Sequence, residues 1–395
     1  MAMKTKEAIG EIPAFAGMTD APAVTFSCSQ CGECCNSILI RIETEKALEL
    51  QARQWVKERL AQFGKRLSRE NAEHWLIPHR PDKSCVFLGD ARQCLIEQHE
   101  GKRLKPSECL SFPFAGLSLP SASKKSPTRL FDCSASCKHV AEDLLDTFAA
   151  IVPETAWQET LPLQNAPQNV RLSFFQRVSW AEYLQRLSQL KPVFTDPSLS
   201  AESALKAARL ILYGHLFYQP PQANTSTFKL SGFKLSGICK SFLLLLFLRK
   251  PYGTLSRIQL LRKRAYQDPY VFGSLRLPGV FETNDAVWDA SAERLLKSFA
   301  YAILHRHVLL SQGHWGASLI AIALLAVILV RWYATVLSEI EGLDHTHQLV
   351  SRQQVASAIR LVERYYTGHQ PRFLAFFNHR IVGLPLGWMM QHRLV

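Results

Sequence analysis

Hydrophobic and polar residues alternate with different periods along the chain, and these periods predict its helices and strands. Residues 38–42 have the pattern of a short strand, and residues 44–67 have the period of an amphipathic helix. The apolar positions on or near one face of that helix are Leu48, Trp55, Leu60 and Phe63. Residues 75–114 predict short irregular segments, and the polar run 121–127 predicts a surface loop.

Helical spacing dominates from about Ala141 onward. It predicts helices at residues 143–152, 180–190, 201–217, 285–310 and 315–340. A last helix is expected to begin with a capping pattern at Ser351 and Gln354 and to end near Gly368. The predicted fold class is an α+β small cysteine-rich metal-binding domain followed by a mostly α-helical domain. The expected boundaries are a flexible leader at 1–24, a cysteine-cluster domain at 25–140 and a helical domain at 141–395.

Two apolar runs bear on whether the chain enters a membrane. Residues 238–248 are too few to cross a bilayer. The run Gly316–Val330 is shorter than the roughly 20 residues that a spanning helix needs, and Arg331 follows it directly. We therefore expect residues 315–340 to form a buried core helix. A membrane-associated protein that uses this helix is the alternative.

The composition is that of a globular protein with a basic surface. Hydrophobic residues make up 47% and charged residues 20%, and the net charge is +13. Such a charge fits nucleic acid, an acidic membrane surface or an acidic protein partner. The Lys and Arg residues are scattered, however, and the chain has no helix-turn-helix, zinc-finger or RNA-binding aromatic motif. A solvated basic surface is the simpler interpretation, and no particular protein partner is indicated.

The cysteines are the most unevenly distributed residues of the chain. Nine of the ten lie between Cys28 and Cys137, and Cys239 lies far from the others. The N-terminal residues have no apolar segment of the length found in secretory signal peptides. We therefore expect a cytoplasmic protein, and in that reducing compartment clustered thiols indicate metal ligands more often than disulfides.

The first four cysteines have a spacing that suits a metal centre. Cys28, Cys31 and Cys34 are each three residues apart, and Cys35 follows directly. Two residues between thiolates allow a tight turn that directs both sulfur atoms at one ion, and Gly32 permits such a turn. The three-residue spacing also matches the opening of a ferredoxin run, but Ile38 stands where that run has its fourth cysteine.

The remaining ligands must therefore come from distant positions. The candidates are Cys85, Cys94, Cys109, Cys133 and Cys137. Without Cys137 the cysteines number eight, which suits two four-ligand sites or one cluster with spare thiols. Because Cys34 and Cys35 are adjacent, we expect their side chains to diverge, one toward a metal and the other toward a second site or the core.

Thiolates select zinc or an iron–sulfur cluster, and the all-sulfur set with its three-cysteine opening favours iron–sulfur slightly.

Other polar residues give weaker signals. His74 and His79 lie too far from the C-x2-C pair for a mixed zinc finger. His305 with His307, and His345 with His347, are two residues apart and do not share a helix face. We expect Asp289, Glu293 and Glu363 to be solvated helix charges.

Several short motifs recur together around these cysteines. They are a C-x2-C-x2-C-C opening, a Cys before an apolar pair, a Cys-x-Ile element, a Pro-x-x-Cys-x-x-Phe-Pro-Phe element and a later Cys, met by Cys28, Cys31, Cys34, Cys35, Cys85, Cys94, Pro106, Cys109, Phe112, Pro113, Phe114 and Cys133. The set resembles the YkgJ-type cysteine-cluster family of zinc- or iron-chelating domains. The resemblance implies that the eight cysteines are metal ligands and that Cys137 is extra. Lys105 and Leu110 stand where the family usually has arginine.

The full length, with its helical second part, resembles the flagellin lysine N-methylase branch of that family. This resemblance implies a second hypothesis, an S-adenosylmethionine-dependent protein-lysine N-methyltransferase. The residues themselves give it little support, because no glycine-rich loop follows a predicted strand and the cysteine spacing differs from that of radical S-adenosylmethionine enzymes. A metal-binding protein with an iron–sulfur cluster or zinc, without an assigned reaction, remains the first hypothesis.

Overall fold

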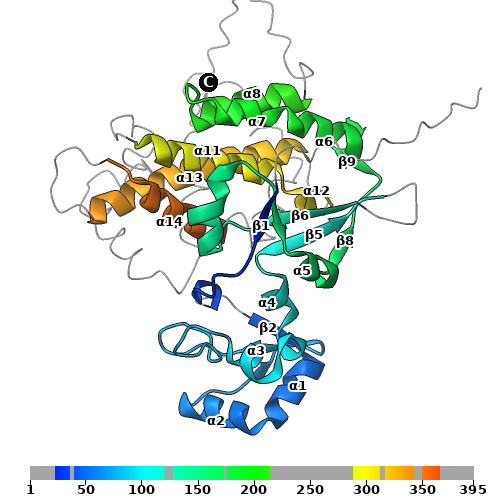
Figure 1. The fold of residues 1–395 in the computed structure, drawn as a ribbon, viewed down its shortest axis with the longest axis vertical. Coiled ribbons are helices and arrows are strands. Elements are labelled where there is room, and N and C mark those ends of the chain that lie inside the picture. The colour runs from blue at the N-terminus through cyan, green and yellow to red at the C-terminus, as the bar shows by residue number, and fades with distance from the viewer. Residues whose placement is uncertain are drawn as a thin grey trace, which may run out of the picture.

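The computed structural model describes residues 23–35, 40–120, 128–172, 176–213, 288–311, 316–341 and 349–364. Figure 1 shows three parts along the longest axis of the molecule. A small lobe with α1 to α4 lies at one end, strands β1, β5, β6 and β8 lie in the middle, and long helices cover the other end. The expected order, an N-terminal region with both strands and helices followed by helices later in the chain, is therefore present.

The small lobe is a three-stranded antiparallel sheet covered by short helices, with strand order β2-β4-β3. Its elements are β2 (Ile40–Glu43), α1 (Thr44–Ala52), α2 (Gln54–Gln62), β3 (Ser68–Arg69), β4 (His74–Ile77), α3 (Leu95–Glu100) and α4 (Ser107–Ser111). Ile42, Leu50 and Phe87 are buried in its core. The predicted strand at 38–42 corresponds to β2, for the residues of it that the structure describes.

The single helix predicted at 44–67 is wrong in two respects. Arg53 adopts an extended backbone, with φ −75° and ψ 132°, so the segment forms α1 and α2 and ends at Gln62. The break changes the helical phase, and Leu48 is 52% exposed while Ala47 and Leu50 are buried. Leu60 is buried as predicted.

The middle part consists of short strands joined over long sequence distances. Its strands are β1 (Val24–Phe26), β5 (Phe114–Ser118), β6 (Arg129–Cys133), β7 (Ile151–Pro153), β8 (Leu163–Asn165), β9 (Asn169–Arg171) and β10 (Arg177–Ser179). Strand β5 lies between β6, which is antiparallel to it, and β8, which is parallel. Strand β1 pairs in parallel with β7, from Val24 opposite Ile151 to Phe26 opposite Pro153. These pairings cross the predicted boundary at residue 140.

The helix predicted at 143–152 is wrong. Residues Val140–Leu144 form one π-helical turn, and Leu145–Thr147 form one 3-10 turn. Phe148 has φ 49°, and Ile151 begins β7. The strand is fixed by its partner β1, which lies far away in the sequence, so local spacing gave no signal for it.

The helices of the second part are α5 (Thr155–Thr160), α6 (Trp180–Ser188), α7 (Leu190–Thr195), α8 (Ala201–Tyr213), α11 (Ala290–Leu304), α12 (His307–Ser311), α13 (Gly316–Glu341) and α14 (Arg352–Val362). Helix α6 begins where the Ser179 side chain accepts the Glu182 N–H, and it buries Trp180, Tyr183 and Leu187. The predicted capping box at Ser351 and Gln354 is confirmed at the start of α14.

The predicted helix at 285–310 is interrupted. Helix α11 ends at Leu304, and α12 begins at His307 after a short break. The two side-chain oxygens of Asp132 accept the backbone N–H groups of His307 and Val308, at 2.9 and 2.7 Å, and so satisfy the first turn of α12. A carboxylate from β6 therefore fixes the place where the new helix starts.

Helix α13 packs against α8, α11 and α14 inside the protein. Ile322, Ala326, Val330 and Ala334 are completely buried. Within the described part of the chain, we find no helix with both the length and the hydropathy needed to cross a membrane.

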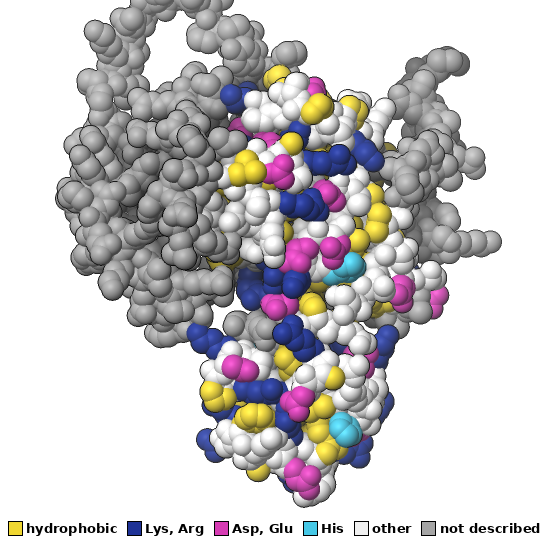
Figure 2. Space-filling model, turned by 60° about the vertical axis from the view of Figure 1, so that its left-hand side comes forward, with side chains coloured by type: hydrophobic (Ala, Val, Ile, Leu, Met, Phe, Trp, Pro, Cys, Tyr) yellow, Lys and Arg dark blue, Asp and Glu magenta, His cyan; other side chains and the backbone are white. Residues whose placement is uncertain are grey.

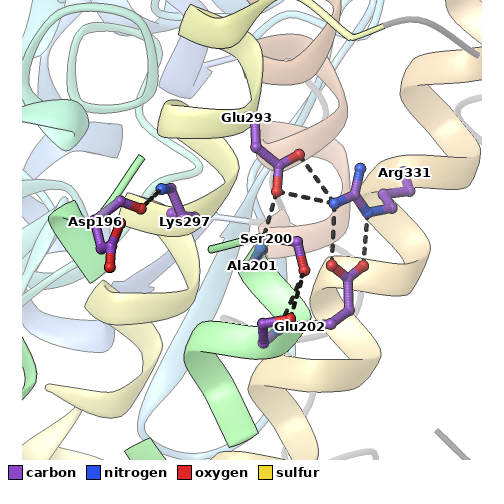
Figure 3. A network of polar contacts seen from close by, with 8 residues as sticks. Asp196, Ser200, Ala201, Glu202, Glu293, Lys297 and Arg331 are labelled. Atoms are coloured by element: carbon purple, nitrogen blue, oxygen red, sulfur yellow. Dashed lines mark hydrogen bonds and ion pairs between the residues drawn. The ribbon is translucent and has the colours of Figure 1, made fainter. Parts of the chain in front are cut away.

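Arg331 joins α13 to two neighbouring helices (Figure 3). Its guanidinium contacts Glu202 of α8 at 2.6 Å and Glu293 of α11 at 2.9 Å. Glu293 also accepts the backbone N–H of Ala201, the first residue of α8, at 2.9 Å. Arg331, the charged residue that ends the apolar run of the sequence, thus links three core helices.

Acidic and basic side chains are interspersed on the face shown in Figure 2. Within the small lobe, whichever face they lie on, Arg41 pairs with Glu70 at 2.7 Å and Arg53 with Glu49 at 3.1 Å. On this face of the described residues, positive charge is therefore balanced locally and forms no continuous basic stripe.

Several sequence features lie outside the described residues. They are leader residues 1–22, the apolar run 238–248 with Cys239, the pair His345 and His347, and the predicted helix end near Gly368.

We predict that Arg331→Met lowers the free energy of unfolding by about 1–3 kcal/mol, because Glu202 and Glu293 then face each other without a cation. Urea unfolding followed by circular dichroism measures this change. Lys206→Met, at an exposed position of α8, is the matched control and should change stability by less than about 0.5 kcal/mol. Equal stability of both variants would contradict the role of this network.

Candidate metal centre

The first four cysteines lie in one tight loop after β1. Residues Glu33–Cys35 form a 3-10 turn, and the Cys35 N–H donates to the Gly32 carbonyl at 3.0 Å. Gly32 has φ +71°, and a Cβ there would lie 3.2 Å from the Arg92 Cβ and 3.3 Å from the Leu88 Cδ1. The expectation that Gly32 permits the turn holds, since both the backbone conformation and the space favour glycine.

The loop brings Cys35 to three cysteines of the small lobe. The Cys85 N–H donates to the Cys35 carbonyl at 2.8 Å. Cys94 lies directly before α3, and Cys109 lies in α4. Lys105 binds Glu97 of α3 at 2.5 Å just ahead of α4, which holds these two helices together. All four cysteines pack against the hydrophobic core of the small lobe.

A second set of contacts brings the same loop to Cys137. The ring of Phe26, two residues before Cys28, lies 5.7 Å from the ring of His139, two residues after Cys137. Arg360 of α14 binds Glu33 at 3.0 Å and Glu142 at 3.5 Å. The loop and the segment after β6 are therefore held together at two points.

Cys34 and Cys35 share a hydrogen bond between their sulfur atoms. This bond lowers the pKa of Cys34 and raises that of Cys35. The bond from Cys35 is the largest effect on Cys34 and lowers its pKa to about 7, with the Lys105 charge acting in the same direction. The same bond raises the pKa of Cys35, and burial and negative charge on Cys34, Cys85 or Cys109 raise it further. One of the two adjacent sulfurs is thus ready to ionise near neutral pH.

The other buried thiols resist ionisation. Burial is the main cause that raises the pKa of Cys85 to about 12 and that of Cys137 to about 11. Burial also raises the pKa of Cys109, and charge on Cys85 and Cys94 adds to this effect. Each thiolate therefore makes the next one harder to form, unless a cation is present.

Backbone N–H groups point at several of these sulfur atoms and oppose the effect of burial. The Gln30 N–H donates to the Cys28 sulfur at 3.4 Å. The Phe87 N–H donates to the Cys85 sulfur, and those of His139 and Val140 donate to the Cys137 sulfur. Such bonds stabilise the ionised form of a thiol, which is the form that binds a metal.

Cys133 has a different environment at the end of β6. Burial raises its pKa well above the ordinary value, charge on Cys137 raises it further, and the other surrounding charges are Glu363, Arg306 and Asp132. Arg306 and Glu363 form a buried ion pair at 2.5 Å, and the Ser134 hydroxyl donates to Glu363 at 3.1 Å. Cys133 thus borders a salt bridge between the residue before α12 and the residue after α14.

Of the three carboxylates expected in solvent, two are bound within the protein. Glu363 is only 1% exposed and pairs with Arg306, so that expectation is wrong. Glu293 is half-buried in the Arg331 network, and Asp289 accepts a hydrogen bond from Ser291 at the start of α11. The partners of Glu363 and Glu293 come from distant segments of the chain, which the local pattern could not indicate.

The two described histidines of the 305–307 pair are structural. His305 is half-buried, and its desolvation is the main cause that lowers its pKa to about 4. Its Nδ1 lies 2.9 Å from the Tyr301 carbonyl, and the His307 Nδ1 lies 3.2 Å from Asp132.

A hydrogen bond joins the Cys28–Cys35 loop to Cys85, and a ring contact joins the residues beside Cys28 and Cys137. Sequence reasoning set Cys137 aside as extra, although its four-residue spacing from Cys133 was visible. Across the residues described, no three Cys, His, Asp or Glu side chains stand in an arrangement that would hold a metal ion as they are. Binding a metal would require the thiols to lose protons and approach one another.

These features define a thiol-rich site of the kind that selects soft metals. A family model named CxxCxxCC and described as a "Putative zinc- or iron-chelating domain" matches residues 27–146. The match covers the loop, the small lobe and Cys133 with Cys137, and it supports metal binding by this part of the chain. No curated protein and no solved structure gives a significant match.

We predict that Cys34 of the reduced, metal-free protein reacts with iodoacetamide with a midpoint near pH 7, because the Cys35 hydrogen bond favours its thiolate. The pKa of Cys28 is raised, chiefly by partial desolvation, so its midpoint should lie at a higher pH than that of Cys34 in the same digest. Peptide mass spectrometry at a series of pH values measures both. Cys35→Ala removes the donor and should move the Cys34 midpoint upward; an unchanged midpoint would contradict the assignment.

Proposed function

We propose that the chain is a metal-binding protein whose cysteine thiolates hold an iron–sulfur cluster or a zinc ion. The observation that supports this proposal best is the gathering of thiols from four separate segments around the Cys28–Cys35 loop. Thiols that are buried together raise one another's pKa. Their ionised forms are therefore unfavourable unless a cation neutralises them. A soft metal ion supplies that charge and binds each sulfur directly.

The donor set fits such a group. Cys35, Cys85, Cys94 and Cys109 offer four sulfur atoms that lie in or against the hydrophobic core of the small lobe. Backbone N–H groups support the sulfurs of Cys28, Cys85 and Cys137, as expected for metal-bound thiolates. Lys105 adds a nearby positive charge: its burial disfavours that charge, but Glu97 and the thiolates outweigh burial and raise the pKa of Lys105.

An iron–sulfur cluster is the first candidate, because every donor is sulfur and the opening spacing is that of a ferredoxin run. Zinc with four cysteines is the second, since it uses the same donors. No contact among the described residues favours the methyltransferase hypothesis over simple metal binding. That hypothesis stays a prediction from the resemblance.

We predict that the protein purified without oxygen contains iron and sulfide with broad visible absorbance, and that Cys85→Ser and Cys109→Ser reduce the bound iron by half or more. Metal analysis with visible spectroscopy measures this directly. A colourless protein with stoichiometric zinc, lost in the same variants, would assign zinc instead.

Cys239→Ser is the matched control, because Cys239 lies outside the cysteine cluster of the sequence. It should leave the metal content unchanged. A folded, reduced wild-type protein that contains neither iron nor zinc would contradict the proposal.

A further inference from the structure

The small lobe joins the rest of the protein at one place. The chain enters the lobe after β1 and leaves it between α4 and β5. These two crossings are adjacent, because the ring of Phe26 at the end of β1 lies 5.4 Å from the ring of Phe114 at the start of β5. Trp157 of α5 lies 5.9 and 5.5 Å from the two rings, and its Nε1–H donates to the Leu110 carbonyl at 2.6 Å. Both ends of the lobe are therefore fixed at the same point.

The small lobe also has a hydrophobic core of its own. Its buried apolar side chains, such as Ile42 and Leu50, form one cluster, and those around Phe26 and Phe114 form another. The buried side chains of the long helices belong to a third cluster. Bodies with separate cores and a narrow connection are expected to move relative to each other about that connection.

The Cys28–Cys35 loop is bound to the small lobe by polar contacts. The Arg92 guanidinium donates to the Cys31 carbonyl at 3.2 Å. The Gln93 side-chain amide donates to the side-chain oxygen of Gln30 at 3.4 Å. A movement of the lobe therefore carries this loop with it.

An ion pair ties the loop to α14, away from the chain crossings. One guanidinium nitrogen of Arg360 lies 3.0 Å from the Glu33 carboxylate, and another lies 3.5 Å from that of Glu142. Figure 1 shows α14 and α5 on opposite sides of β1. The side chains of Arg360 and Glu33 are 18% and 29% exposed. Ion pairs that water reaches contribute little free energy, so this one can break and form again.

We infer that Arg360 and Glu33 form a latch, and that the small lobe swings away from α14 about the Phe26–Phe114 contact when the latch opens. The cysteines of the lobe and its loop then change their distance from Cys133 and Cys137, which lie at the end of β6 and beyond. The latch is a property of the fold itself. Metal-free protein therefore tests it, separately from the proposed function.

Single-molecule fluorescence energy transfer in the reduced, metal-free full-length protein measures this motion. The dyes are attached to a ketone-bearing amino acid at Lys57 of α2 and Gln353 of α14, which are both exposed, so that no cysteine is labelled. Glu33→Gln and Arg360→Gln should each raise the low-transfer population about threefold to fivefold, as expected for the loss of a partly exposed ion pair. Added salt should raise this population in the wild-type protein, because it screens the pair, but not in the two variants.

Glu142→Gln is the matched control, because it removes a carboxylate from the same guanidinium and leaves the Arg360–Glu33 contact in place. It should keep the wild-type distribution. The double variant Glu33→Gln with Arg360→Gln should open no further than either single variant, since both remove one contact.

One identical distribution for the wild type and all variants at every salt concentration would overturn the inference. Equal opening by Glu142→Gln and Glu33→Gln would also overturn it, because the contact with the loop would then have no special role. The salt series on the wild-type protein decides the question even where a variant does not fold.

Discussion

Mutual repulsion between buried sulfur charges is the constraint on which the cysteine-rich part depends. Burial already raises the pKa of Cys85, Cys109 and Cys137, and each ionised neighbour raises it further. The protein offsets part of this repulsion with backbone N–H groups and with Lys105. These supply partial charges and one full charge, so a metal is the group that completes the balance.

The elements that the sequence predicted well are those whose signals are local. Helix α6 has an N-cap at Ser179 and apolar residues with helical spacing, and α14 has its capping box at Ser351 and Gln354. Each of these helices contains its own start signal. Strand β7 could not be predicted in this way, since it is fixed by hydrogen bonds to β1. The break at Arg53 likewise had no glycine or proline to mark it.

The same distinction explains the candidate site. The cysteine set, the turn at Gly32 and the need for distant ligands followed from spacing. The pairing of Glu363 with Arg306 joins residues 57 apart in the sequence, and that of Glu33 with Arg360 joins residues 327 apart. A carboxylate that lies next to helical residues is usually exposed, and only the packed fold gives it a buried partner. The relation of Cys137 to the loop depends on these same long-range contacts.

The parallel pairing of β1 with β7 has a consequence for how the protein is made. The loop with Cys28 is anchored on one side by a strand that the ribosome adds much later in translation. The first four cysteines can therefore take their folded position only late in translation, after β7 has left the ribosome.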